Sequence, residues 1–82
     1  MKYEDLRDIV INIKTKRNHL NDGEKLCVRV DLDTLSYYEG LFIDMTAHER
    51  MIRMETHKGV KYIAIQHIVA VSYWVDKNPI LE

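Results

Sequence analysis

The clearest candidates for chemistry are the basic residues in the stretch KTKRNH, at positions 14–19. Lys14, Lys16 and Arg17 place three cations close together, with His19 beside them. Such a cluster can bind nucleic-acid phosphates, because each neutralised phosphate releases condensed counterions. The same residues are typical of the solvated C-terminal end of a helix, where cations complement the helix dipole. The formal net charge of −1 lacks the basic excess usual in dedicated nucleic-acid binders, so the sequence leaves both interpretations open.

The chain has four histidines, which raises the question of a metal site. Metal sites need ligands that converge on the ion, usually supplied as close pairs of Cys and His. The histidines here are widely spaced, and the lone Cys27 has no partner Cys or His close to it in sequence. We therefore expect solvated histidines, with no metal and no other cofactor. The residues concerned are His19, His48, His57 and His67.

No residue pattern predicts an enzyme. Cys27 follows Leu26 within an alternating segment, and only Arg29 lies near enough in sequence to favour its thiolate. A glycine-rich phosphate loop, a serine nucleophile elbow and a specially placed carboxylate pair are all missing from the sequence. We expect no catalytic residues and no small-molecule substrate.

Cysteine usage and hydropathy favour the cytoplasm. The single cysteine has no intrachain disulfide partner, which fits a reducing compartment. The first residues, MKYED, lack the basic-then-apolar order of a signal peptide. No apolar run approaches the roughly 20 residues of a membrane span. We therefore expect a cytoplasmic protein with no membrane partner.

The first element that must position these residues is a helix over about 4–20. Its apolar residues recur at i, i+3, i+4 and i+7, which is one stripe of an amphipathic helix. Gly23 can adopt the left-handed conformation that ends a helix. The stripe consists of Leu6, Ile9, Val10 and Ile13.

After Gly23 the apolar period changes to 2, as the alternation in KLCVRVDL shows. Every later connection is brief, which favours antiparallel neighbours. Pro79 ends regular structure. The expected strands span about 25–32, 36–45, 50–57, 60–66 and 68–75.

One helix followed by five short strands predicts a single, mainly β domain over residues 1–82. Five antiparallel strands with one apolar face tend to curl into a small, strongly bent barrel of the SH3-like type, since an open sheet would expose two edges. The helix would cap one open end. Gly40 lies in the middle of the second strand, where a glycine permits a sharp bend or a close backbone approach.

Two stretches carry a family resemblance. VRVDLDTLSYYEGLFIDM, at 28–45, resembles the first motif of the Sm-like superfamily, which includes Hfq. YIAIQHIVAVSYW, at 62–74, is similar to the second motif, in which a strand passes through a 3₁₀ turn into the last strand. The resemblance covers most of the chain, from Asp5 to about Trp74, and rests on pattern more than on identity. It implies a helix followed by a five-stranded, bent barrel that assembles into rings.

The chain departs from the family at the RNA pocket. In the family an Asp commonly follows the glycine by six positions, and an Asn often follows that Asp by four. Those places hold Thr46 and Arg50 here. The Tyr-Lys-His of the Hfq type falls on Ile65, Gln66 and His67, so only the histidine matches. The resemblance therefore implies a divergent member that lacks most RNA-contact residues, with His67 as a nucleic-acid contact or as an ordinary turn histidine.

The aromatic residues favour an interface. Adjacent strand residues face opposite ways, so Tyr37–Tyr38 and Tyr73–Trp74 each present one ring at the surface or an edge. Exposed rings stack on bases or anchor protein contacts. In Sm-like rings the fourth strand of one subunit pairs with the fifth strand of the next, which implies a homo-oligomer here. The expected interface comprises Tyr62, Ile63, Ile65, Ile68, Val69, Val71, Tyr73 and Trp74.

Two functions follow from these features. The first is a small Sm-like oligomeric module that binds RNA through surface cations and aromatic rings, with Lys14, Lys16, Arg17 and His67 as contacts. The alternative is a protein-interaction or structural module that has lost RNA binding. The basic stretch favours the first function, and the missing pocket residues favour the second.

Overall fold

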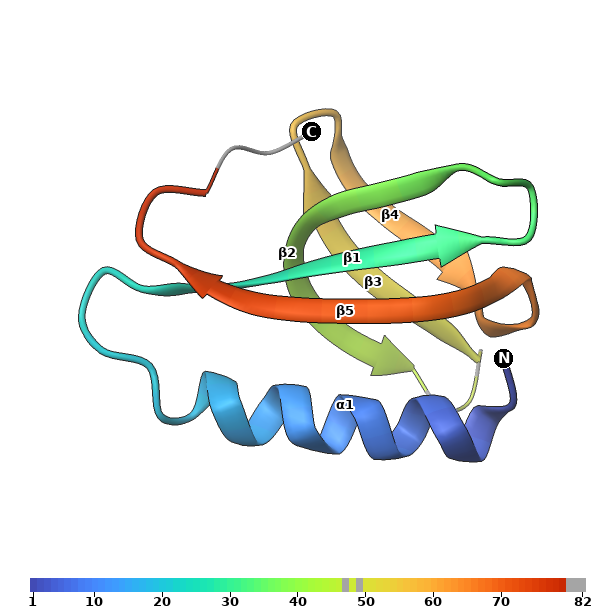
Figure 1. Ribbon diagram of the computed structural model, residues 1–82, viewed down its shortest axis with the longest axis horizontal. Coiled ribbons are helices and arrows are strands. Elements are labelled where there is room, and N and C mark those ends of the chain that lie inside the picture. Colours follow the sequence, from blue (N-terminus) through green and yellow to red (C-terminus); the bar gives the residue numbers. More distant parts are fainter. Residues whose placement is uncertain (47, 49, 80–82) are drawn as a thin grey trace.

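The computed structural model describes residues 1–46, 48 and 50–79. It shows one N-terminal helix followed by five strands, in the order that the sequence predicted (Figure 1). The strand bounds lie within a residue or two of those expected, and the helix ends at Arg17, where i→i−3 hydrogen bonds to Lys16 and Arg17 replace the helical pattern. The elements are α1 (Tyr3–Arg17), β1 (Lys25–Leu32), β2 (Tyr37–Thr46), β3 (Met51–Thr56), β4 (Gly59–Ala64), η1 (Ile65–His67) and β5 (Ile68–Asp76).

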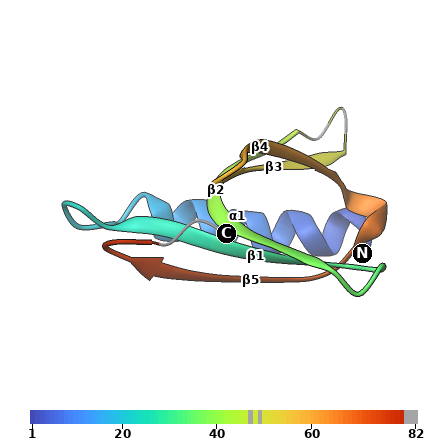
Figure 2. The same ribbon diagram turned by 90° about the horizontal axis from the view of Figure 1, so that it is seen from above.

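The strands form one antiparallel sheet in the order β4-β3-β2-β1-β5. Figure 2 shows β3 and β4 arching over β1 and β5, while β2 curves from one half of the sheet to the other. The prediction of a closed barrel is wrong, because β4 and β5 are the two edges of the sheet and do not pair with each other. The sheet is strongly bent but open.

The core lies between the two halves of the bent sheet and α1. The helix buries Leu6, Val10 and Ile13 in this core, and Ile9 is partly buried. Because the helix covers one side of the core, the apolar side chains are shielded from water even though β4 and β5 do not pair with each other. The strands and η1 contribute Leu26, Val28, Val30, Phe42, Ile52, Met54, Ile63, Ile65 and Ile68.

Gly40 permits a close approach between β2 and β3. A Cβ atom at this position would lie 2.0 Å from the carbonyl oxygen of Glu55, a contact that real Cβ atoms do not make. Two residues further along β2 the register with β3 shifts between Phe42 and Asp44, which leaves Ile43 as a bulge. Bulges bend the strand that carries them. The prediction that Gly40 serves a close backbone approach in a bent strand is therefore confirmed.

Among the described residues, no helix has the length and apolarity that a membrane span would require.

Candidate functional site

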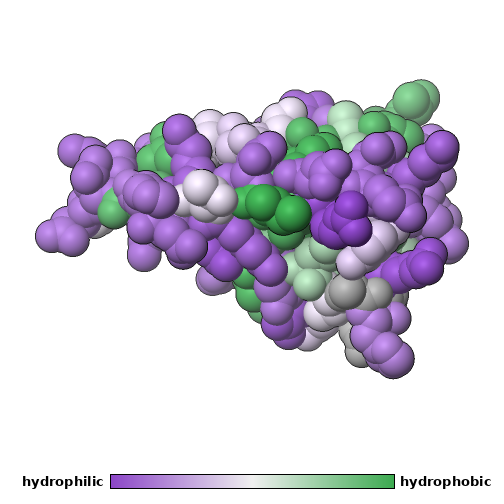
Figure 3. All heavy atoms as spheres, turned by 90° about the horizontal axis from the view of Figure 1, so that it is seen from below, coloured by the Kyte–Doolittle hydropathy of each residue, from purple (hydrophilic) through white to green (hydrophobic). Residues whose placement is uncertain are grey.

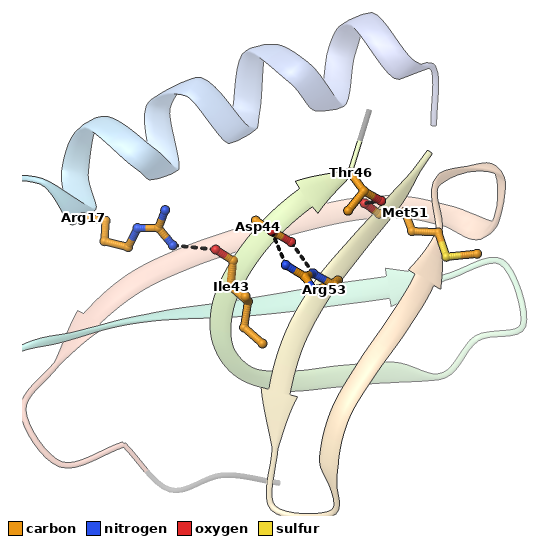
Figure 4. Close-up of polar contacts among 6 residues, drawn as sticks. All are labelled: Arg17, Ile43, Asp44, Thr46, Met51 and Arg53. Atoms are coloured by element: carbon orange, nitrogen blue, oxygen red, sulfur yellow. Dashed lines mark hydrogen bonds and ion pairs between the residues drawn. The ribbon is translucent and has the colours of Figure 1, made fainter. Parts of the chain in front are cut away.

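The predicted cations at the end of α1 differ in their surroundings. Lys14 and Lys16 are exposed. Figure 3 shows that the face of the molecule seen from below is mainly hydrophilic. Arg17 is half-buried: its Nη1 donates a hydrogen bond of 2.7 Å to the carbonyl oxygen of Ile43, and its guanidinium lies 5.1 Å from the centroid of the Phe42 ring. Arg17 therefore ties the helix to the bulge in β2 (Figure 4), which is a structural role.

An ion pair lies next to that bulge. Arg53 on β3 donates to both carboxylate oxygens of Asp44, with an Nε–Oδ1 distance of 2.6 Å (Figure 4). The hydrogen bond from Arg53 holds the pKa of Asp44 below its usual value; partial burial opposes this, and the charges of Arg53, Lys14 and Arg17 add to it. The same hydrogen bond raises the pKa of Arg53. The charges of Lys14 and Arg17 are therefore close enough to Asp44 to lower the pKa of its carboxyl group.

His67 does not join the helix cations. It lies in η1, at the opposite end of the long axis from the C-terminal end of α1 (Figure 1). Its Nδ1 is 3.2 Å from Oδ2 of Asp33, and its carbonyl oxygen accepts a hydrogen bond of 2.9 Å from the Asp33 amide. These contacts tie η1 to the β1–β2 turn. The four predicted nucleic-acid contacts therefore do not form a single site.

The predicted interface residues divide into a buried set and an exposed set. Ile63, Ile65 and Ile68 belong to the core. Val71 is partly buried. The exposed residues lie on the two free edges: Tyr62 is on β4, and Val69, Tyr73 and Trp74 are on β5.

One groove brings predicted residues of both kinds together. It runs between the C-terminal half of α1 and the last residues of β5 and has a volume of about 840 Å³. Lys16 and His19 line it from the helix side, and Tyr73 and Trp74 line it from the strand. We call it the α1–β5 groove. A predicted cation, Lys16, and two aromatic rings therefore do meet here, although Lys14, Arg17 and His67 are not part of the groove.

A second concave region was missed by the sequence analysis. Two hollows, of about 370 and 290 Å³, share Tyr38 on β2, and together we call them the Tyr38 cleft. The first hollow carries the cations of the β3–β4 hairpin, Lys58 and Lys61. The second is lined mainly by apolar atoms, and His67 lies at it. The sequence signal was the pair of lysines in HKGVK, but only the pairing of β2 with β3, in which Leu41 lies opposite Glu55, brings that hairpin near Tyr38.

Cys27 is buried and shows no sign of reactivity. It is 2% exposed, and burial raises the pKa of its thiol, with the charges of Asp76 and Glu39 acting in the same direction. A raised pKa disfavours the thiolate, which is the nucleophilic form. Within residues 1–46, 48 and 50–79, no three His, Cys, Asp or Glu side chains converge as metal ligands.

Comparison of the chain with protein-family models, with curated proteins and with solved structures found no match.

Proposed function

We propose that this protein is a small, self-assembling binding module of the Sm-like kind, in which β4 of one copy pairs with β5 of the next. The observation that carries the proposal is the strand order, which leaves β4 and β5 as free edges on one bent sheet. Exposed edges are templates for pairing with another chain, and natural proteins protect them when they stay monomeric.

Both edges carry apolar side chains that a monomer leaves in water. Val60 and Tyr62 on β4 are 48% and 59% exposed, and Val69 on β5 is 58% exposed. Tyr and Trp are enriched at the centres of protein interfaces, which suits Tyr62 and Trp74. A head-to-tail contact between different edges is heterologous, so it forms a ring if the rotation closes. A chain of 82 residues also has a small core and gains stability by assembly.

The size of the protein in solution tests the assembly. Light scattering coupled to size exclusion should give a mass of several chains, and Val69→Lys should shift the protein toward the monomer, because lysine on an edge strand opposes pairing. Ile11→Lys is the matched control, since Ile11 has a similar exposure of 54% but lies on α1. A wild-type protein that stays monomeric at high concentration contradicts the proposal.

RNA binding in the α1–β5 groove is the second candidate function. The groove brings Lys16 beside Trp74, which combines a phosphate-binding cation with a ring able to stack on a base. Because Trp74 also belongs to the β5 edge, RNA and a neighbouring β4 would compete for this region. A gel shift with single-stranded RNA at two salt concentrations, on wild type and on Lys16→Ala, tests the idea, and absent or salt-insensitive binding removes it.

A cytoplasmic location forms part of the same proposal. It is supported by Cys27, which is the only cysteine and remains a free, buried thiol.

A further inference from the structure

The Tyr38 cleft combines two chemically different halves within one copy of the chain. Tyr38 lies between them because it lines both hollows. One half contains the β3–β4 hairpin, and the other contains the β1–β2 turn, β4 and η1. Together the hollows have the size of a small-ligand site, for which about 300–1,000 Å³ is typical. The chemistry of each half indicates what kind of ligand would fit.

The hairpin half is basic, and its backbone is held in place. Lys58 and Lys61 line this half together with His57. The buried Thr56 fixes the turn, because its Oγ1 accepts a hydrogen bond of 3.2 Å from the Lys58 amide and donates one of 3.0 Å to the Gly59 carbonyl. Within the described part of the chain, neither lysine takes part in an ion pair. Both ammonium groups are therefore available to an anion.

The other half is largely apolar. Leu32, Ile63 and Ala64 line it beside the rings of Tyr38 and Tyr62. An arginine already lies over each of two other rings, since Arg29 is 3.9 Å from the Tyr37 centroid and Arg53 is 6.0 Å from that of Tyr62. Among the described residues, no cation covers the ring of Tyr38. Tyr38 is 37% exposed, so its ring can stack on a planar group.

The acidic residues around the cleft already have partners. Glu39 lies 3.7 Å from Nη1 of Arg29, and Asp33 lies 3.2 Å from the ring of His67. These contacts reduce the repulsion that either carboxylate would exert on an incoming anion. Lys58 and Lys61 therefore make the cleft attractive to a negatively charged group.

We propose that the Tyr38 cleft binds one nucleotide unit of a single-stranded nucleic acid, with the base stacked on Tyr38 in the apolar half and the phosphate held by Lys58 and Lys61. An anionic group joined to a flat, apolar group matches both halves at once. The lining residues all come from a single copy, and Tyr62 is shared with the β4 edge that the assembly would use. The cleft is also distinct from the α1–β5 groove, whose lining includes none of these residues.

Fluorescence anisotropy with a labelled oligouridylate tests this site. Tyr38→Leu keeps apolar bulk but removes the ring, and should weaken binding about 5- to 100-fold, whereas Tyr38→Phe should bind like wild type. Lys58→Ala combined with Lys61→Ala should weaken binding and lower the slope of log K against log salt by about 0.7 in magnitude, since the two lysines hold one phosphate and each neutralised phosphate on a single strand contributes roughly 0.7. Thermal unfolding of each variant confirms that it folds.

Lys25→Ala combined with Lys77→Ala is the matched control, because it removes two exposed lysines that line neither the Tyr38 cleft nor the α1–β5 groove. It should leave oligouridylate binding within about twofold of wild type. The groove variants Lys16→Ala and Trp74→Leu are measured beside it. The proposal is overturned if wild type does not bind, if Tyr38→Leu binds as tightly as Tyr38→Phe, or if only the groove variants lose binding. Uridine monophosphate is the second probe, and an affinity equal to that of the oligomer overturns the assignment to a nucleic-acid strand.

Repeating the titration on Val69→Lys separates this proposal from the one on assembly. Unchanged binding by a monomeric variant supports a site within one copy. Binding that disappears with the oligomer overturns the single-copy site but leaves the assembly proposal standing.

Discussion

Gly40 shows how one residue determines the path of two strands. Its α-carbon faces the Glu55 carbonyl of β3. A Cβ atom at this position would lie 2.0 Å from the Glu55 carbonyl oxygen, which is much closer than van der Waals contact allows. The obstacle is backbone, so no side-chain rotation can relieve it. The bend of β2, and with it the position of the β3–β4 half of the sheet, therefore depends on the missing side chain.

Gly40→Ala should destabilise the fold by at least about 2 kcal/mol, because the added methyl group must displace a paired strand. Gly23→Ala is the control: nothing lies within 4 Å of its Cβ position, so only the strain of its positive φ of 81° is added, at about 1–2 kcal/mol. Urea unfolding of both variants measures the difference. A Gly40→Ala variant that is as stable as wild type would contradict the close approach.

Asp44 makes the stability depend on pH on the acid side. Its pKa is lower in the folded chain than in the unfolded chain, chiefly because of the hydrogen bond from Arg53. The unfolded state therefore binds the proton more tightly, so the pair stabilises the fold above the ordinary Asp pKa of about 3.9, and this stabilisation is lost as the pH falls through the folded value.

Asp44→Asn should lower the free energy of unfolding near pH 7 and should flatten its fall between about pH 5 and pH 2. Arg53→Gln should have the same two effects, because it removes the hydrogen bond that shifts the pKa. Chemical unfolding across this pH range checks both variants. A fall with pH as steep in both variants as in wild type would show that Asp44 contributes little.

At the scale of elements, α1 is attached to the sheet by apolar contacts and by one directed polar contact. Leu6, Val10 and Ile13 supply the apolar part. Arg17 supplies the polar part by donating to the Ile43 carbonyl, which the bulge in β2 turns away from the regular ladder. Arg17, which the sequence predicted as a phosphate contact, therefore also links two elements.

Arg17→Lys should cost roughly 1 kcal/mol, because an ammonium cannot donate to Ile43 and lie flat over Phe42 in the manner of a guanidinium. Lys16→Arg is the control, since Lys16 is exposed, and it should be neutral within about 0.5 kcal/mol. Denaturant unfolding compares the two. If Arg17→Lys were as stable as wild type, the charge of residue 17 would matter and the geometry of the guanidinium would not.

At the scale of the whole molecule, the open sheet leaves the protein with two unpaired edges and a small core. If β4 and β5 pair between copies, unfolding is coupled to dissociation and the midpoint of thermal unfolding rises with protein concentration. Over about a hundredfold range of concentration we expect a rise of roughly 5 °C or more for wild type, and a flat response for Val69→Lys. Differential scanning fluorimetry measures both. A flat wild-type response would contradict assembly.

The alternation of apolar residues by itself determined the secondary structure. The helix stripe and the period-2 strands predicted the element order, because burial of one face imposes these periods locally. The bend of β2 at Gly40 was predicted separately, because a glycine inside a strand permits a sharp bend or a close backbone approach. Such features depend on residues that are near one another in the chain, so one sequence is enough to reveal them.

Only the tertiary structure decided which residues meet. It separated His67 from the helix cations, placed Ile63, Ile65 and Ile68 in the core, and left the predicted barrel open. It also brought Lys58 and Lys61 to a cleft shared with Tyr38, some 20 residues earlier in the chain. The physical reason is that these contacts arise from the bend of β2 and the packing of α1, which join segments far apart in the chain and leave no periodic signal in it.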